Sequence, residues 1–181
     1  MKRFAHALIA LPATLAVLVA ATGAHAHATL EHTSAPAGSF YKAVIGITHG
    51  CDGSGTVAVR VTIPEGVKRA KPMPKPGWQL AVKLEPLDEP YEWYGATVTE
   101  DVREIVWRGG PLPDAHYDEF AFRAKLPDAE GQTIYFETIQ ECEEGAYRWV
   151  EHVEPDGHAG HAGHAKAPAP ALRLTAPEAG H

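Results

Sequence analysis

Apolar residues recur at every second position through most of the chain between residues 43 and 140. A period of two is typical of β-strands that bury one face and expose the other. It predicts strands over 43–47, 57–63, 78–84, 120–126 and 134–140, with Ile105 and Trp107 marking a further short one. No segment has the 3.6-residue apolar repeat of a helix, and Gly and Pro cluster between the strands. We therefore predict an all-β domain over residues 27–154, an immunoglobulin-like or cupredoxin-like β-sandwich.

The first 26 residues have the pattern of a secretory signal peptide. Lys2 and Arg3 precede an apolar run from Ala7 to Ala21, and Ala24-His25-Ala26 forms a small-x-small cleavage signal. The apolar run is shorter than the roughly 20 residues that a spanning helix needs. We expect cleavage after Ala26, no membrane span in the mature chain, and a periplasmic or otherwise extracytoplasmic location.

Cleavage after Ala26 would make His27 the first residue. An N-terminal His offers an α-amine and an imidazole that both lose their protons near neutral pH. Together they can chelate one metal ion, and Cu(II) suits such a nitrogen pair best. A His at this place can also be accidental. Cleavage after Ala24 would instead leave His27 third, where amine, amides and imidazole can surround Cu(II) or Ni(II).

Composition and charge narrow the function. The 181 residues include 45% hydrophobic and 22% charged ones, which is ordinary for one globular domain. The net charge of −7 becomes −9 once Lys2 and Arg3 leave with the signal peptide. An acidic surface repels a phosphate backbone, so we expect no nucleic-acid partner. The 11 His against 2 Cys favour imidazole metal chemistry over thiolate clusters.

Cys51 and Cys142 each end a predicted strand. Two Cys in an exported protein are expected to form a disulfide. The alternative is a blue-copper thiolate, which needs a nearby His and usually an axial Met. Met73 is the only Met left after cleavage, and no Cys-x-His-x-Met grouping exists. The sequence therefore favours the disulfide.

Residues 155–181 are rich in Ala, Gly, Pro and His, and this composition predicts a disordered tail. His158, His161 and His164 repeat every three residues within it. They are candidate auxiliary ligands for Cu(II), Ni(II) or Zn(II). A solvated linker without metal is the alternative that the composition leaves open.

Four blocks of the sequence carry a family resemblance: HATL at the predicted mature start, GVKRAKPMPKPGWQL, EIVWRGGPLPDAHYDEFAFRAKL and YFETIQECEEGAYRWVE. Together they resemble the YcnI family of exported copper-binding domains, over nearly the whole core. The resemblance implies a β-sandwich that holds Cu(II) in a single-histidine brace. Such a brace consists of the N-terminal amine and imidazole, a carboxylate and a nearby Trp.

The resemblance transfers to particular residues of this chain. It places the brace on His27, the carboxylate on Glu119 and the Trp on Trp149, as a capping or neighbouring residue. The alternation around Glu119 puts it opposite Phe120 and allows a ligand or an exposed Glu. Asp118 or Glu137 would serve if the register differs, and Trp78 is expected to pack in the core or line the site.

The leading hypothesis is a non-catalytic exported protein that binds Cu(II) for trafficking, buffering or homeostasis, with another exported copper chaperone as a candidate partner. The scarcity of Met and free thiol favours Cu(II) over Cu(I). One alternative is a copper-dependent oxidative enzyme, which would need a second imidazole from the remaining domain histidines, His32, His49, His116 and His152. The other is an envelope interaction module without metal.

Overall fold

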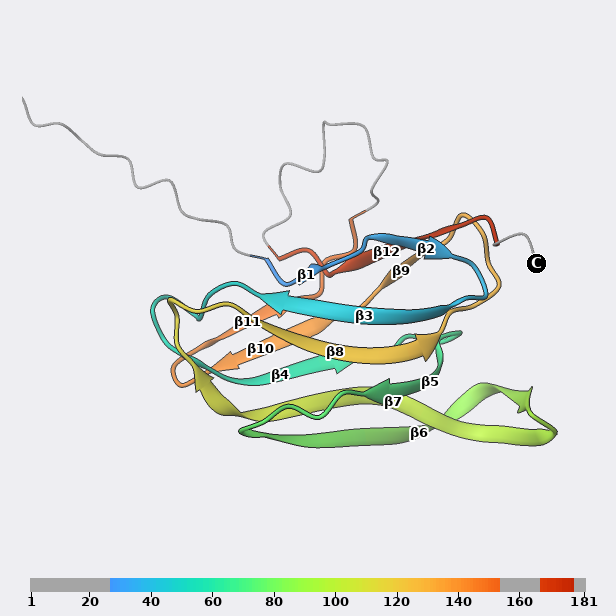
Figure 1. The fold of residues 1–181 in the computed structure, drawn as a ribbon, viewed down its shortest axis with the longest axis horizontal. Helices are drawn as coiled ribbons and strands as arrows, with labels where there is room; N and C mark the ends of the chain where they lie inside the picture. The colour runs from blue at the N-terminus through green and yellow to red at the C-terminus, as the bar shows by residue number, and fades with distance from the viewer. Residues whose placement is uncertain (1–26, 154–166, 178–181) are drawn as a thin grey trace, which may run out of the picture.

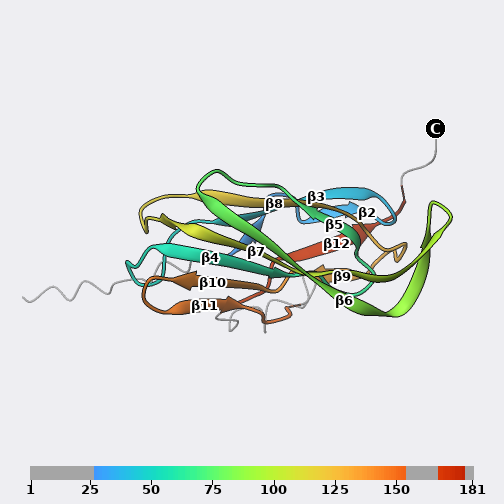
Figure 2. The same cartoon turned by 90° about the horizontal axis from the view of Figure 1, so that it is seen from below.

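Twelve strands and no helix make up the part of the chain that the computed structural model describes, residues 27–153 and 167–177. Two main sheets lie face to face (Figures 1 and 2). In strand order, the first contains β1 (Thr29–Leu30), β3 (Phe40–Ile47), β8 (Asp118–Lys125) and β5 (Lys68–Pro72). The second contains β11 (Ala146–Trp149), β10 (Thr138–Cys142), β4 (Thr56–Thr62), β7 (Ala96–Leu112) and β6 (Trp78–Trp93). The fold is the expected β-sandwich.

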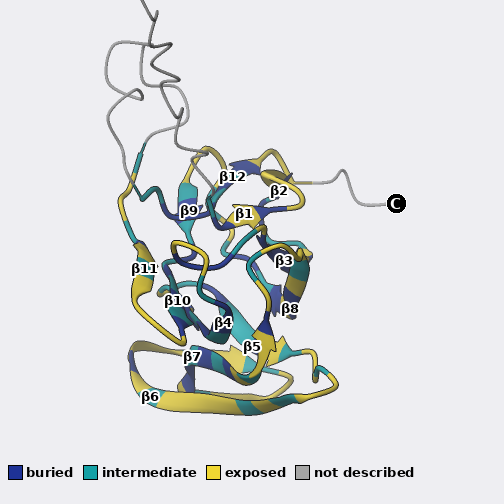
Figure 3. Cartoon of the chain, turned by 90° about the vertical axis from the view of Figure 1, so that its left-hand side faces the viewer, coloured by how far each residue is buried: buried dark blue, intermediate teal, exposed yellow. Residues whose placement is uncertain are grey.

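A third sheet lies along the β1 and β3 side of the sandwich (Figures 1 and 3). It contains β2 (Ser34–Pro36), β12 (Ala171–Thr175) and β9 (Thr133–Tyr135). β12 pairs with β2 in parallel and with β9 antiparallel, whereas every pairing in the two main sheets is antiparallel.

The alternating apolar residues form the core between the sheets, as the period of two predicts. Ile45 and Phe120 from the first sheet and Val59, Ile105 and Trp107 from the second are fully buried. The buried indole Nε1 of Trp107 donates to the Met73 carbonyl at 3.0 Å, which satisfies its only polar group. The strands expected over 57–63 and 120–126 coincide with β4 and β8 to within two residues at each end. β3 begins three residues before the strand expected over 43–47, and β6 continues to Trp93, nine residues past the expected end of 78–84.

The expected strand over 134–140 is wrong as one element, because the chain changes sheets within it. β9 ends at Tyr135 and β10 begins at Thr138. Between them, the Phe136 amide donates to the carbonyl of Pro170, directly before β12, and the Glu137 carbonyl accepts from the Thr62 amide of β4. The apolar alternation continues across this junction because both halves face the core, so the sequence pattern does not reveal the break.

The disordered tail predicted over 155–181 is wrong for residues 167–177. β12 lies there, and its Leu172 and Leu174 are completely buried. Glu151 and Pro168 form a parallel β-bridge. The domain therefore extends past residue 154, because β12 supplies apolar side chains to the core. His158, His161 and His164 lie outside the described residues.

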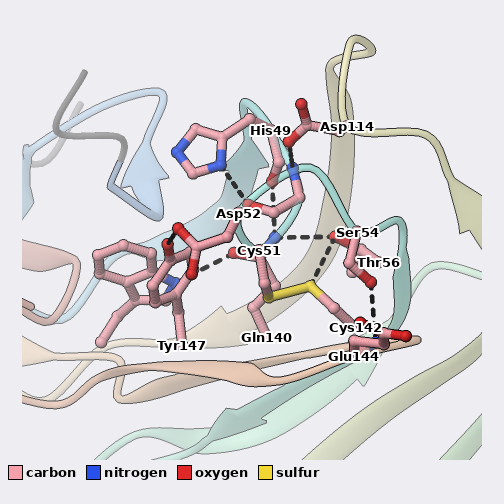
Figure 4. Close-up of a disulfide and its surroundings, with 12 residues drawn as sticks. His49, Cys51, Asp52, Ser54, Thr56, Asp114, Gln140, Cys142, Glu144 and Tyr147 are labelled. Atoms are coloured by element: carbon pink, nitrogen blue, oxygen red, sulfur yellow. Dashed lines mark hydrogen bonds between the residues drawn. A yellow bond between two sulfur atoms is a disulfide. The ribbon is translucent and has the colours of Figure 1, made fainter. Parts of the chain in front are cut away.

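Cys51 and Cys142 form the expected disulfide, with an S–S distance of 2.02 Å (Figure 4). It joins the β3–β4 connection to the end of β10 across 91 residues of sequence. The alternative blue-copper thiolate is wrong, because neither sulfur is a free thiolate.

In the part of the chain that the structure describes, no helix is long and apolar enough to cross a membrane.

The β6–β7 hairpin is the longest element, and most of β6 is exposed (Figure 3). A buried carboxylate anchors the hairpin to the sandwich. Asp101, which is 3% exposed, accepts hydrogen bonds from the Arg69 amide at 2.7 Å and from the Tyr91 hydroxyl at 2.5 Å. These bonds offset the cost of burying the charge.

Candidate metal centre

The predicted anchor, His27, lies two residues before β1 and packs against Trp149 at the end of β11. The two ring centroids are 5.8 Å apart with planes tilted by 48°. Trp149 is 4% exposed, so its ring forms a wall beside the imidazole rather than a surface contact. The structure thus brings together two of the three residues that the resemblance assigned to a copper site. In the full chain the His27 nitrogen is a peptide nitrogen, and only cleavage after Ala26 would make it an amine.

Trp149 is held in place by a buried glutamine that the sequence analysis missed. Gln140 is 2% exposed, and its Oε1 accepts from the Trp149 Nε1 at 3.3 Å. Its Nε2 donates to the His49 carbonyl at 2.6 Å and to the Thr56 Oγ1 at 2.8 Å. A buried amide needs such partners. A Gln at an inward-facing position of a strand was the available signal for this network.

Glu119 lies on the outer face of β8, on the same sheet as β1. It is in register with Gly46 of β3, and Gly46 is in register with Thr29 of β1, two residues after His27. Glu119 and Thr29 are therefore separated by two strand spacings, about 10 Å between backbones. No side chain stands between them on β3, because residue 46 is Gly.

The ring of Tyr117 covers Gly46 and its hydroxyl reaches Glu119. The Tyr117 Oη donates to the Glu119 Oε1 at 2.7 Å. A Cβ on Gly46 would lie 3.1 Å from the Tyr117 ring and 3.1 Å from the Thr29 Oγ1. The carboxylate hydrogen bond raises the pKa of Tyr117 to about 12. Tyr117 therefore remains a neutral donor that orients the carboxylate, a role that no sequence pattern indicates.

The two alternative carboxylates are each paired with a basic side chain. Asp118 lies 2.5 Å from the Lys75 ammonium, and Glu137 lies 2.9 Å from the His152 Nε2. His152 also stacks on Tyr135, with centroids 4.2 Å apart. The Glu119 carboxylate instead accepts a hydrogen bond from the neutral Tyr117 hydroxyl, so it is better placed to bind a metal ion than Asp118 or Glu137.

The other candidate residues have separate surroundings. Trp78 packs edge-on against Phe120 at 5.0 Å, the core role expected for it. His32 lies 3.6 Å from the Glu31 carboxylate, and the His49 ring packs edge-on against Tyr147 at 6.1 Å. The His116 amide donates to Pro113 in the β7–β8 connection.

Among residues 27–153 and 167–177, no group of three or more His, Cys, Asp or Glu side chains is placed to hold a metal ion.

Comparisons with known proteins support the fold. The family model described as "Domain of unknown function (DUF1775)" matches residues 27–174, the range from two residues before β1 into β12. The chain is also similar to an uncharacterized protein from Nocardia farcinica, whose crystal structure reveals an immunoglobulin-like fold. The two are 22% identical, with a TM-score of 0.61, over 82% of this chain and 98% of the other. No curated protein matches.

Proposed function

The chain belongs to the DUF1775 family of domains of unknown function, and we propose that it is an exported Cu(II)-binding protein that carries or buffers copper through His27. The observation that carries the proposal is the contact between His27 and the buried Trp149, 5.8 Å apart, at the edge of the sheet that presents Glu119. The resemblance of the sequence to YcnI proteins supports the same function.

The chemistry of the donor set fits Cu(II). After cleavage, the His27 amine and imidazole would supply two nitrogens, and Glu119 an oxygen, which are the ligands that Cu(II) prefers. Tyr117 would orient the carboxylate, as outer hydrogen-bond donors do around metal sites. Trp149 would shield one side of the imidazole from water. Bound copper would be held rather than exchanged freely, because amine and imidazole chelate together.

A binding role is proposed in preference to an oxidative enzyme. An oxidative copper site would use a second imidazole, but the structure places His32 beside Glu31 and His152 beside Glu137. Export is supported by the disulfide, since such bonds persist in oxidising compartments. The acceptor would be another exported copper chaperone. His158, His161 and His164 are retained as proposed auxiliary ligands.

The test compares exported protein beginning at His27 with the same protein carrying one extra N-terminal Gly. N-terminal sequencing first establishes the cleavage site, and Cu(II) EPR and competition titration then report the donor set and the affinity. We expect the extended protein to lose the nitrogen pattern of the wild-type spectrum and to bind copper at least about tenfold more weakly, ~1.4 kcal/mol. His32→Ala serves as the matched control and should bind normally. Equal affinity and identical spectra in the two proteins would contradict the proposal.

A further inference from the structure

Three aromatic rings form a continuous row that begins at His27. The Trp149 ring lies 5.8 Å from the imidazole, and the Tyr147 ring lies 5.2 Å from the Trp149 ring. Trp149 is buried, whereas Tyr147 is only partly buried. The row therefore leads from the candidate metal position, through the protein interior, to the surface.

The outer end of this row has a proton acceptor. The Tyr147 hydroxyl donates to the Asp52 Oδ1 at 2.9 Å (Figure 4). Loss of an electron from a tyrosine makes its hydroxyl strongly acidic, so a carboxylate at hydrogen-bond distance makes the oxidation easier. The Trp149 Nε1 donates instead to the neutral side-chain amide of Gln140, which is a much weaker proton acceptor than a carboxylate. An oxidising equivalent on Trp149 would therefore pass downhill to Tyr147.

The local fold fixes this arrangement. Asp52 occupies the left-handed region at φ 50° in a tight turn closed by two hydrogen bonds between Cys51 and Ser54. Asp tolerates that conformation better than most residues. The Glu144 amide donates to the Ser54 Oγ at 2.8 Å, and the disulfide joins the same turn to β10. The turn that carries Asp52 is thereby pinned to the β10–β11 hairpin that carries Tyr147.

We propose that Trp149 and Tyr147 form a relay that removes oxidising equivalents from a copper ion bound at His27 and releases them at the surface. The inference rests on the proposed copper site, because bound Cu(I) meeting hydrogen peroxide is the source of the oxidant. The relay protects His27, which is the residue nearest to that oxidant. It adds a redox role to Tyr147 and Asp52, neither of which is assigned to metal binding.

The electrons and protons balance as follows. An external one-electron reductant such as ascorbate would first convert bound Cu(II) to Cu(I), and Cu(I) would then reduce hydrogen peroxide to hydroxide and a hydroxyl radical, returning to Cu(II). The radical takes one electron from Trp149 and becomes hydroxide. Trp149 regains that electron from Tyr147, whose hydroxyl proton moves to Asp52. The products are a second hydroxide, a neutral tyrosyl radical and a protonated Asp52, and an external reductant such as ascorbate then restores Tyr147 at the surface.

The main test uses processed protein loaded with copper, reduced with ascorbate, mixed with hydrogen peroxide and frozen for EPR. We expect a tyrosyl radical in the wild type and at least a fivefold smaller signal in Tyr147→Phe. Peptide mapping by mass spectrometry should show at least threefold more oxidation at His27 in that variant. Asp52→Asn, which keeps a hydrogen-bond acceptor but is a much weaker base, should slow radical formation. Tyr94→Phe is the control, since Tyr94 is 91% exposed at the hairpin tip.

A second arm works without copper. Azide radicals from pulse radiolysis oxidise tryptophan, and absorbance then follows the transfer of the radical from tryptophan to tyrosine. The measurement is made in a Trp93→Phe background, which removes the Trp93–Tyr94 contact. We expect each of the substitutions Tyr147→Phe and Trp149→Phe to abolish one kinetic phase of the radical transfer from tryptophan to tyrosine. Unchanged radical yield, His27 oxidation and transfer kinetics in Tyr147→Phe would overturn the relay. Absence of a His27-dependent Cu(II) EPR signal in the wild type would instead overturn the copper site. The copper-free experiment would still decide whether the radical passes from Trp149 to Tyr147.

Discussion

At the scale of single residues, the carboxylates available to a metal ion differ in what already pairs with them. Asp118 contacts a lysine and Glu137 contacts a histidine, whereas Glu119 accepts from the Tyr117 hydroxyl. We expect Glu119→Gln to weaken Cu(II) binding by at least about tenfold, ~1.4 kcal/mol, because an amide oxygen carries no charge. Glu137→Gln, the matched control, should change it less than about twofold. Competition titration measures both, and the opposite ranking would move the ligand to Glu137.

Gln140 is the residue whose replacement tests the support of Trp149. Gln140→Leu has a similar size but removes the partners of the His49 carbonyl, the Thr56 hydroxyl and the Trp149 indole. Leaving a buried polar group unpaired costs about 1–3 kcal/mol, so we expect a loss of about 2–5 kcal/mol in the free energy of unfolding. Denaturant unfolding with the disulfide intact measures it. The exposed Gln79→Leu should change stability by less than about 0.5 kcal/mol, and equal effects of the two changes would refute the buried network.

At the scale of elements, β12 decides where the domain ends. Leu174 is 1% exposed, so Leu174→Ala should cost about 2–5 kcal/mol through lost burial and a cavity. The neighbouring Thr175→Ala, on an exposed position, should be nearly neutral. A chain ending at residue 154 loses the partner of both β2 and β9, and we expect it to lose cooperative unfolding. If that truncated chain unfolded at the same denaturant concentration as the full chain, β12 would have no structural role.

The strands also differ in how well the sequence predicts them. β4 carries Val57, Val59 and Val61 at every second position, so its period of two predicts it directly, although Thr56 and Ala58 on its other face are buried too. β12 has only five residues in a stretch rich in Ala, Pro and Gly, and its stability comes from pairing with strands about 40 and 140 positions earlier. Local composition therefore predicts disorder where long-range pairing supplies a strand.

The same distinction holds at the candidate site. His27 as an N-terminal ligand stays a prediction, because it rests on the pattern of a signal peptide. The Cys51–Cys142 disulfide is predictable from the sequence, because two Cys have one possible pairing. The placement of Tyr117 over Gly46 is not predictable from the sequence, because it depends on the register of β3 against β8. Glu119 and Trp149 were assigned only through a family resemblance, for a similar reason: their neighbours lie on other strands.

At the scale of the whole molecule, three tyrosines on separate parts of the sandwich make stability depend on alkaline pH. Burial raises the pKa of Tyr41 to about 12, burial and the bond to Asp101 raise that of Tyr91 to about 12, and the bond to Glu119 raises that of Tyr117 to about 12. In the unfolded chain these hydroxyls titrate near 10. Between pH 10 and 12 the unfolded chain therefore releases protons that the folded chain retains.

This difference fixes the sign of the pH effect. The stabilisation is fully present below pH 10 and is lost as the pH rises through the folded pKa near 12, because proton release favours the unfolded state. We expect the urea midpoint to fall steadily from pH 10 to 12, with a shallower fall in Tyr41→Phe. Tyr94→Phe, at the exposed hairpin tip, should leave the slope unchanged. A midpoint independent of pH over this range would mean that these hydroxyls are no harder to ionise in the folded sandwich than in the unfolded chain.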